Sequence, residues 1–523
     1  MFICAGALMA RPELAAQDCP RPAIGSAVEE PADVRSSGGM LHVSFAFRSS
    51  TGRFGAELYC YLSADGAQSP TLRVHAGDEL ALTLKNELPS GGSAHMHGNH
   101  SQPVCGGGPM TAASTNLHFH GLEIPPACHQ DETLHTLIQP GDPGFEYRVK
   151  IPADQPPGLY WYHPHPHGFS ERQVLGGASG ALIVGGIERS DPRVAGLAER
   201  VLILRDEAVP GLAEDAEDSG PGKNISINYV PVMYPLYRPA GLSVRPAQRE
   251  FWRVLNAAAD TYFDVQVRFG PIIQDIQDPQ LLDLVALDGV PIGGPAADRR
   301  THVLLAPGAR AEFILSTPPL GTFAQLVTLS YDTGPDGAAS PYRVIANIDA
   351  SNSAPPIPAM PAAPAVATRS FTGLTAAKPV RTRRLYFSET VDPQDPKATK
   401  YFITAEGATP KVFDMNFVQP DIQVRQGTVE DWVIENRAKE AHAFHIHQLH
   451  FQLLERDGEK VNEPALRDTI DLPYWDGKSQ RYPSVKLRMD FRNPAIVGTF
   501  VYHCHILEHE DGGMMGVIQV NRR

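Results

Sequence analysis

Apolar and polar residues alternate along three stretches of the chain that share one pattern. The stretches are LRVHAGDELALTLKN from Leu72, LSVRPAQREFWRVLN from Leu242 and IQVRQGTVEDWVIEN from Ile422. Each begins with an apolar residue, one variable residue and Val, and each ends on an Asn fourteen residues after its first residue. Alternation with a period of two is typical of strands with one face on a core, and Gly77 and Gly427 lie where a turn is needed. The pattern predicts one strand-turn-strand unit that is present three times.

The first and last copies share a second motif further along the chain. GLYWYHPH from Gly158 and GTFVYHCH from Gly498 place Gly, an aromatic residue, Tyr and His-x-His at equal offsets. The stretch GTFAQLVTLSYD from Gly321 takes this place in the middle copy and contains no His. We infer that the first and third domains are related copies. The middle domain has kept the strand pattern and lacks the histidines of this motif.

The repeats and the local composition divide the chain into segments. Alternating strands and regular turn signals predict an all-β fold of three Greek-key β-sandwich domains, at residues 31–190, 191–352 and 381–523. The Pro/Ala-rich segment 353–380 between the last two is expected to be a semi-rigid, extended linker. Residues 1–30 form an N-terminal arm whose apolar start is either the remnant of an export signal or a frayed hydrophobic tail.

Net charge, apolar runs and cysteine content limit the partners and the cellular compartment that we expect. The 523 residues carry a formal charge of -14 without a long Lys/Arg run, which argues against a nucleic-acid partner. Apolar runs stay shorter than the roughly 18 residues of a membrane span, so no spanning helix is expected. Four of the six Cys residues are candidates for disulfides of undetermined pairing and favour a periplasmic or secreted protein: Cys19, Cys60, Cys105 and Cys128.

Histidines recur as four His-x-His units, two in each outer domain. The units are His118 and His120, His163 and His165, His445 and His447, and His503 and His505. Residues two apart in a strand point to the same side, so each unit offers two imidazoles to one cavity. Imidazole suits copper, zinc, iron and nickel, so these eight side chains do not by themselves identify the metal.

A second group of residues indicates copper. Cys504, His442 and His509 make a set of two His and one Cys, and Met514 follows ten residues after the Cys as a candidate weak axial ligand. Such a set is typical of a blue-copper electron-transfer site, in which the Cys binds as thiolate. Pro164 takes the place of Cys504 in the first domain, which can therefore hold half of a histidine cluster and no blue copper.

With HFHG, WYHPHPHG, HAFHIH and HCHILEHEDGGMM in these positions, the chain resembles the three-domain multicopper oxidases of the bacterial laccase-like type over nearly its whole length. The resemblance implies three tandem cupredoxin-like domains and four copper ions. It assigns the type 1 copper to His442, Cys504, His509 and Met514, and the type 2 copper to His118 and His445. It assigns one type 3 ion to His120, His163 and His505, and the other to His165, His447 and His503. Cys504 and its two neighbours would then give electrons a short covalent route between the centres.

Acids are expected near the cluster, because the reduction of dioxygen by four electrons also takes up protons. Glu510, six residues beyond Cys504, matches an acidic position of the bacterial enzymes that the chain resembles. Asp131, eleven residues beyond His120, is the candidate acid beside the type 2 copper. The alternative for both is an ordinary surface carboxylate.

Other histidines fall outside the repeated frame. His167, the third His of HPHPH, is expected to have a supporting or structural role, and His129 and His450 a structural one. The Gly/Ser-rich insert from Ser90 to Ser114 contains HMHGNH, whose histidines are His95, His97 and His100. This stretch is either an extra copper-loading site or a solvated flexible loop, and we favour the loop.

The resemblance implies an oxidase that takes single electrons from phenols or aromatic amines near His509 and reduces dioxygen to water. A cuprous or other metal-ion oxidase serving copper tolerance is the second interpretation, although the 11 Met are scattered and not clustered as soft Cu(I) ligands. A non-catalytic relative that binds a protein partner would not need the full ligand set, and a copper nitrite reductase lacks four His-x-His pairs in one chain. We expect a monomer whose partners are small reducing molecules and dioxygen.

Overall fold

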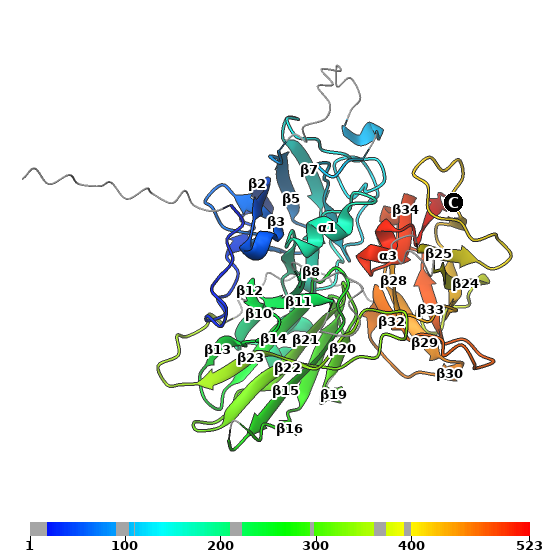
Figure 1. Ribbon diagram of the computed structural model, residues 1–523. Coiled ribbons are helices and arrows are strands. Elements are labelled where there is room, and N and C mark those ends of the chain that lie inside the picture. Colours follow the sequence, from blue (N-terminus) through cyan, green and yellow to red (C-terminus); the bar gives the residue numbers. More distant parts are fainter. Residues whose placement is uncertain are drawn as a thin grey trace, which may run out of the picture.

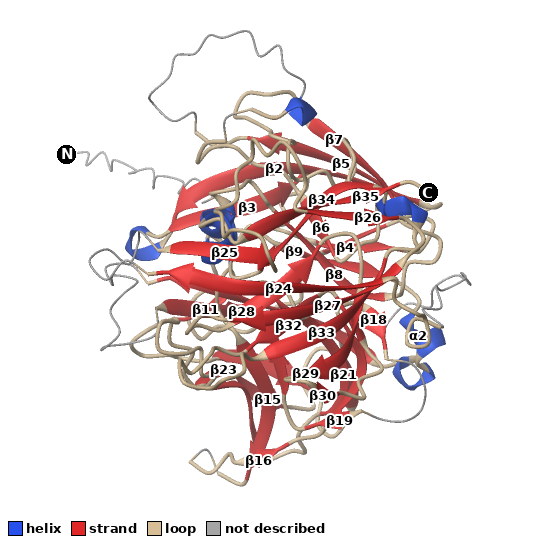
Figure 2. Cartoon of the chain, turned by 90° about the vertical axis from the view of Figure 1, so that its right-hand side faces the viewer, coloured by secondary structure: helices blue, strands red, loops and turns tan. Residues whose placement is uncertain are grey.

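The computed structural model consists mainly of β-strands, with short helices between them (Figure 2). It describes residues 18–89, 104–108, 110–209, 222–272, 274–292, 298–359, 373–391 and 399–523. Within these ranges the strands form six sheets, which pair into three sandwiches that follow one another along the chain (Figure 1). The predicted all-β fold of tandem sandwiches is confirmed.

The first sandwich packs a four-stranded sheet against a five-stranded one. The first sheet has the order β3 (Glu57–Ser63), β2 (Met40–Thr51), β5 (Glu79–Asn86), β7 (Phe145–Lys150). The second has the order β1 (Asp33–Arg35), β4 (Thr71–Val74), β9 (Gly180–Val184), β8 (Gly158–His163), β6 (His118–His120). The loops contain α1 (Ser170–Leu175) and the 3-10 turns η1 (Arg53–Gly55) and η2 (Val104–Gly106). A core that includes Phe47, Leu82 and Tyr162 fills the space between the sheets.

The middle sandwich is built in the same way from two larger sheets. One has the order β12 (Val230–Val232), β11 (Lys223–Ile227), β10 (Ala198–Ala208), β14 (Arg249–Asn256), β21 (Arg310–Ser316), β17 (Leu282–Leu287), β18 (Val290–Pro291), with β19 (Arg299–Arg300) paired to β17. The other has the order β13 (Ala240–Val244), β23 (Arg343–Ala350), β22 (Phe323–Leu329), β15 (Phe263–Gly270), β16 (Asp278–Pro279), with β20 (Val303–Leu305) paired to β15. The short helices α2 (Ile187–Ser190) and η3 (Pro192–Val194) precede it, and Trp252, Phe313 and Leu326 lie in its core.

The third sandwich carries the last sequence motifs. Its larger sheet has the order β25 (Lys400–Ala405), β24 (Arg381–Thr390), β27 (Val429–Asn436), β33 (Ser484–Asp490), β29 (Phe451–Arg456), β30 (Glu459–Lys460), with β31 (Leu466–Arg467) paired to β29. Its smaller sheet has the order β26 (Ile422–Arg425), β35 (Met515–Asn521), β34 (Gly498–Cys504), β28 (His442–Ile446), β32 (Thr469–Leu472). The 3-10 turn η5 (Pro494–Ile496) and the helix α3 (Leu507–Asp511) flank β34. Trp432, Phe444 and Tyr502 belong to its core.

The three sequence repeats form the same feature in each sandwich. They correspond to the strand pairs β4 and β5, β13 and β14, and β26 and β27. In each pair the first strand belongs to one sheet and the second strand to the other, so the turn crosses the sandwich. Gly77 and Gly427 both have φ +90° at this turn, a conformation that suits glycine. The middle copy has Ala247 at the equivalent position, with φ +52°.

The Asn that ends each repeat is buried and ties loops together. Its side-chain oxygen accepts a hydrogen bond from the main-chain amide two residues further on. Its side-chain amide donates to carbonyl groups of other loops, from Asn86 to Ala113 and Ile138, from Asn256 to Thr261 and Leu305, and from Asn436 to Glu440 and Pro473. A buried amide that satisfies main-chain carbonyls in this way explains why the repeats end on the same residue. In the third sandwich this bond fixes the segment that leads into β28.

Two disulfides fasten the first sandwich. Cys19 is bonded to Cys60, which joins the N-terminal arm to β3, and Cys105 is bonded to Cys128, which joins η2 to the loop after β6. The pairing that the sequence left open is thus determined. Cys504 is free and buried.

The predicted domain boundaries stay a prediction, and parts of the predicted arm and linker lie outside the described residues. The arm from residue 18 contacts the middle sandwich, since the amide of Val28 donates to the carbonyl of Gly241 at 2.7 Å. Among the residues described, none of the helices has the length and apolar character needed to cross a lipid bilayer.

Candidate metal centre

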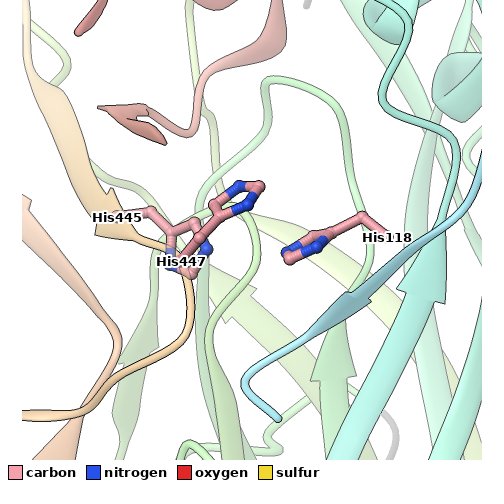
Figure 3. Close-up of side chains that lie close together, drawn as sticks. All are labelled: His118, His445 and His447. Atoms are coloured by element: carbon pink, nitrogen blue, oxygen red, sulfur yellow. The ribbon is translucent and has the colours of Figure 1, made fainter. Parts of the chain in front are cut away.

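The four His-x-His units lie on paired strands of the two outer sandwiches or begin there and end just after the strand. In the first sandwich β6 pairs with β8, and His118 lies opposite His163. In the third, β28 pairs with β34, and His445 lies opposite His503. The two strand pairs face each other, so that the ring of His118 points from one sandwich toward the rings of the other (Figure 3). All eight imidazoles are buried in one cluster between the sandwiches.

One set of three rings brings its nitrogens close together. Nε2 of His503 lies 3.2 Å from Nε2 of His447 and 3.5 Å from Nε2 of His165. These three nitrogens lie close enough to share one ion. They are the set that the resemblance assigns to one type 3 ion.

A second set contains the remaining histidines of the cluster. Nε2 of His505 lies 3.3 Å from Nδ1 of His120, and the rings of His505 and His163 are 5.6 Å apart. Nε2 of His163 is buried without a hydrogen-bond partner among the described residues. The same holds for Nε2 of His118 and of His445, the residues assigned to the type 2 ion.

The protonation of these rings is suited to metal binding. Burial is the largest cause that lowers the pKa of His120, His163, His165, His445, His447 and His503 well below the ordinary value, and it lowers the pKa of His505 to about 3. When the nitrogens of neutral rings face each other without a proton between them, their lone pairs repel each other. A cation bound between the rings removes this repulsion. The cluster therefore fits metal ions bound by imidazole.

A separate group lies on the other side of β34. Nδ1 of His442 and Nδ1 of His509 are 3.0 Å apart, and Sγ of Cys504 is 3.6 Å from each. The amide of Ala443 points at the sulfur, at 3.5 Å. A thiolate with two imidazoles is the ligand set of a blue-copper site, so this group fits such a site.

Met514 is held next to this group by its main chain. Its carbonyl accepts from the amide of Cys504 at 3.1 Å, and its amide donates to the carbonyl of His509 at 2.8 Å. Its side chain is fully buried in the same core cluster as Cys504. The axial role of its sulfur stays a prediction.

The strand geometry explains how one tripeptide serves both groups. Side chains alternate along β34, so Sγ of Cys504 at its end turns to one side while the ring of His503 turns to the other. The ring of His505, the residue after the strand, lies 5.5 Å from that of His503. In the first sandwich Pro164, directly after β8, lies between His163 and His165, and this segment contributes to the cluster alone.

Asp131 orients a ring of the cluster. Both of its carboxylate oxygens lie 3.0 Å from Nδ1 of His118, and one accepts the amide of Phe119 at 2.9 Å. Gln448 donates to the other oxygen. Because Nδ1 carries the donated hydrogen, Nε2 of His118 is the nitrogen that faces the cluster.

Glu510 contacts two other rings of the cluster. Its carboxylate oxygens are 3.5 Å from Nε2 of His165 and 3.3 Å from Nδ1 of His503, and its side chain is fully buried. Burial is the main cause that raises the pKa of Glu510 well above its ordinary value. Neither this carboxyl nor that of Asp131 lies at the surface, which removes the alternative considered from the sequence.

Sequence reasoning did not identify two residues that contact these rings. Asp468 accepts from Nδ1 of His445 through its carbonyl, at 2.8 Å, and its carboxylate lies 3.2 Å from Nε2 of His120. Glu440 lies with one carboxylate oxygen 3.2 Å from Nε2 of His509. Both belong to ordinary loop sequence without a motif, so only the fold places them at the site.

The histidines outside the frame lie apart from the two groups. His167 packs its ring against Phe413 at 4.8 Å, and its burial lowers its pKa to about 4. His129 donates from Nδ1 to the carbonyl of Glu146. His450 is buried near the carboxylates of Glu123 and Asp468. The HMHGNH stretch with His95, His97 and His100 lies outside the described residues.

Comparisons with known proteins show which proteins the chain is similar to. Two family models described as multicopper oxidase match residues 109–188 and 390–523. The chain is 24% identical over 473 residues to Multicopper oxidase mco of Staphylococcus haemolyticus, with 86% of this chain and 81% of that protein covered. It is 22% identical over 499 residues to the Laccase of Bacillus subtilis, covering 85% and 87%.

Solved structures show the same fold. A multicopper oxidase from Campylobacter jejuni, described as a metallo-oxidase, superposes with a TM-score of 0.68 at 23% identity over 99% of both chains. A laccase-like multicopper oxidase CueO from Ochrobactrum sp. superposes with a TM-score of 0.64 at 21% identity, covering 96% of this chain and 100% of that one.

Proposed function

The chain belongs to the multicopper oxidases, and from this premise we propose that it oxidises small reducing molecules one electron at a time at His509 and reduces dioxygen to water at the histidine cluster. The members of this family are copper oxidoreductases that use oxygen. We further propose four copper ions per chain, bound by the residues that the resemblance assigns.

One observation carries the proposal: a single tripeptide contacts both groups. Cys504 lies with His442 and His509, whereas its neighbours His503 and His505 belong to the cluster between the sandwiches. When bound, copper would supply the one-electron redox steps, first at the Cys504 group and then at the cluster. The main chain and side chains of these three residues give electrons a continuous covalent path.

Two acids, Asp131 and Glu510, contact rings of the cluster. Asp131 holds the Nδ1 hydrogen of His118 and so directs Nε2 into the cluster. Burial raises the pKa of Glu510 well above its ordinary value, and its carboxylate oxygens lie within 3.5 Å of two rings of the cluster. A buried carboxyl at this position is suited to a reaction that consumes protons.

The surroundings of His509 favour an aromatic donor. The ring of Tyr401 stacks on His509 with centroids 4.4 Å apart and an angle of 23°. The imidazole itself is 1% exposed, so electrons would enter across its edge without binding of the donor to the metal. We propose phenols and aromatic amines as donors, since their flat rings can pack beside this aromatic pair.

The carboxylate of Glu440 beside His509 favours a second candidate, the oxidation of metal ions such as Cu(I). A negative group 3.2 Å from the entry histidine attracts a cation more than a neutral phenol. Glu389 adds a second carboxyl near Glu440, and desolvation followed by the charge of Glu440 raises its pKa to about 7. The related structure from Campylobacter jejuni is described as a metallo-oxidase.

A periplasmic or secreted location is proposed as well. It is supported by the two disulfides of the first sandwich, because such bonds persist in oxidising compartments. We expect the protein to act as a monomer.

Copper analysis and oxygen uptake test the proposal. Copper-loaded protein should contain four copper ions per chain and show an intense absorption near the red end of the visible spectrum, as expected for a thiolate-bound cupric ion. It should consume oxygen with a methoxyphenol as the donor. Far fewer copper ions, or no such absorption, would contradict the proposed sites; uptake with Cu(I) and none with the phenol would select the metal-ion oxidase.

A further inference from the structure

Arg310 is a buried residue of the middle sandwich whose side chain contacts all three sandwiches. Its Nε donates to the carbonyl of Leu159 in the first sandwich, at 3.1 Å. Its Nη1 and Nη2 each donate to one carboxylate oxygen of Asp468 in the third sandwich, both at 2.7 Å. The remaining hydrogens point at the carbonyls of Gly308 and Asp288, at 3.2 and 2.9 Å. All five donors of the guanidinium are therefore used.

Asp468 connects this guanidinium to two rings of the histidine cluster. Its carboxylate oxygen Oδ1 lies 3.2 Å from Nε2 of His120, which comes from the first sandwich. Its main-chain carbonyl accepts from Nδ1 of His445, which comes from the third, at 2.8 Å. The two rings are stacked on each other with centroids 3.9 Å apart and an angle of 14°. One residue thus sets the orientation of a stacked pair that spans two sandwiches.

The contacts with Asp468 decide which nitrogen each ring presents to the cluster. Because His120 donates from Nε2, its Nδ1 is left without a hydrogen and lies 3.3 Å from Nε2 of His505. Because His445 donates from Nδ1, its Nε2 is the free nitrogen, buried without a partner among the described residues. A ligand histidine is oriented through its other nitrogen in this way in many metal sites.

The middle sandwich supports Asp468 from a second direction. Asp288 accepts the amide of Arg310 at 2.8 Å through one oxygen and the amide of Asp468 at 3.2 Å through the other. The loop before Arg310 also touches the cluster, because a Cβ on Gly308 would lie 2.8 Å from Nε2 of His505. The domain without His-x-His units therefore forms one wall of the cluster.

We propose that Arg310, acting through Asp468, is a positioning residue of the histidine cluster, so that the middle sandwich takes part in metal binding without contributing a ligand. This inference rests on the proposed function. The alternative is an ion pair that joins the sandwiches and has no effect on the histidine rings. Stability alone would not decide between the two, because buried ion pairs often add little to it. The two explanations differ in what removal of the guanidinium does to the cluster.

The test compares full-length, copper-loaded variants. Arg310→Met keeps much of the side-chain volume and removes the charged fork, Arg310→Lys keeps the charge, and Asp468→Asn removes the acceptor pair. Arg253→Met is the matched control: Arg253 is equally buried, pairs with Glu199 and Glu312, and Glu312 accepts the amide of Leu159 of the first sandwich. Copper per chain is measured after dialysis against graded chelator, with electron paramagnetic resonance and the visible absorption recorded, and the melting temperature of the copper-free proteins is compared.

Arg310→Met and Asp468→Asn should bind copper at the histidine cluster about 10- to 100-fold more weakly, the usual effect of losing a residue that orients a ligand. The absorption of the Cys504 site should stay, and the paramagnetic signal of copper bound by histidine alone should change. Arg310→Lys should restore only part of the affinity, because ammonium cannot form the two parallel bonds. Arg253→Met should lower the melting temperature and leave the copper unchanged.

The inference is wrong if Arg310→Met and Asp468→Asn hold cluster copper as tightly as Arg253→Met, with an unchanged paramagnetic signal. It is also wrong if copper leaves both centres in parallel with a loss of folding in Arg310→Met and Asp468→Asn. Should Arg310→Met fail to fold, Asp468→Asn alone decides. Failure of the proposed function is distinguishable, because the unmodified protein itself would then lack copper at one or both groups.

Discussion

Both carboxylate oxygens of Asp131 lie 3.0 Å from Nδ1 of His118, and both residues are almost fully buried. A carboxylate that accepts the hydrogen of a ring nitrogen fixes the tautomer and raises the basicity of the other nitrogen. Asp131, thirteen residues after His118 in the chain, therefore orients a ring that is assigned to the type 2 copper.

Replacing Asp131 with Asn should weaken copper binding at this position. Asn offers one oxygen in place of two and no charge, so we expect the affinity for the copper assigned to His118 and His445 to fall about 10- to 100-fold. Copper per chain after dialysis against a chelator measures the change. Glu132→Gln is the control, since Glu132 bonds to His135 and Thr136 in the same loop. Equal copper retention in the two variants would contradict the role of Asp131.

Replacing Cys504 with Ser should separate the two centres. The variant should lose the intense visible absorption and one copper per chain, because a hydroxyl does not bind copper as thiolate does. Copper at the histidine cluster should stay, since no cluster ring depends on the sulfur for its hydrogen bonds. Oxygen uptake with any donor should fall to background. Persistent uptake would show that electrons reach the cluster without passing Cys504.

Replacing Glu440 with Gln should discriminate between the two donor classes. Removal of one negative charge beside His509 should lower kcat/KM for Cu(I) by about 10-fold and change that for a methoxyphenol by less than about 2-fold. Oxygen uptake with each donor gives the two ratios. Glu459→Gln, on the exposed strand β30, removes the same charge elsewhere. If both donors respond equally, Glu440 does not act on the charge of the donor.

The equivalent turns of the repeats predict opposite effects of two substitutions. Gly77→Ala should destabilise the protein by about 1 kcal/mol, because the backbone at φ +90° disfavours a side chain, although no atom lies within 4 Å of the added Cβ. Ala247→Gly should stabilise the middle sandwich by up to about 1 kcal/mol, because it relieves the strain at φ +52°. Calorimetric melting of the copper-free proteins measures both. The same sign for both variants would exclude backbone strain as the cause.

The repeated alternation and the ligand spacing are local properties, and for this reason the sequence was informative about them. Strand pairs that bury one face need the period-two pattern, and two imidazoles need His-x-His to share a face. The strands and the convergence of the rings of His118, His163, His445 and His503 follow from these patterns. The sequence showed that each repeat ends on Asn. It did not show the reason, which is that Asn86 and its counterparts form hydrogen bonds between loops.

Contacts between distant segments carry no spacing rule, so the sequence did not indicate them. The pairing of Cys19 with Cys60, the position of Asp468 against His120 and the approach of Glu440 to His509 depend on how loops close in space. The middle domain showed this limit most clearly, since the absence of histidine in its motif said nothing about Arg310.

By itself the sequence predicted the class of the fold, copper as the metal and the side chains that would bind it, because strand periodicity and donor chemistry depend on residues a few positions apart. The tertiary structure alone decided which nitrogens His118, His120 and His445 present, which carboxylates contact the rings and how the middle sandwich forms one wall of the cluster. The physical reason is that hydrogen-bond partners of a buried ring are chosen by packing across three sandwiches, at sequence separations of 13 residues for Asp131 and 348 for Asp468.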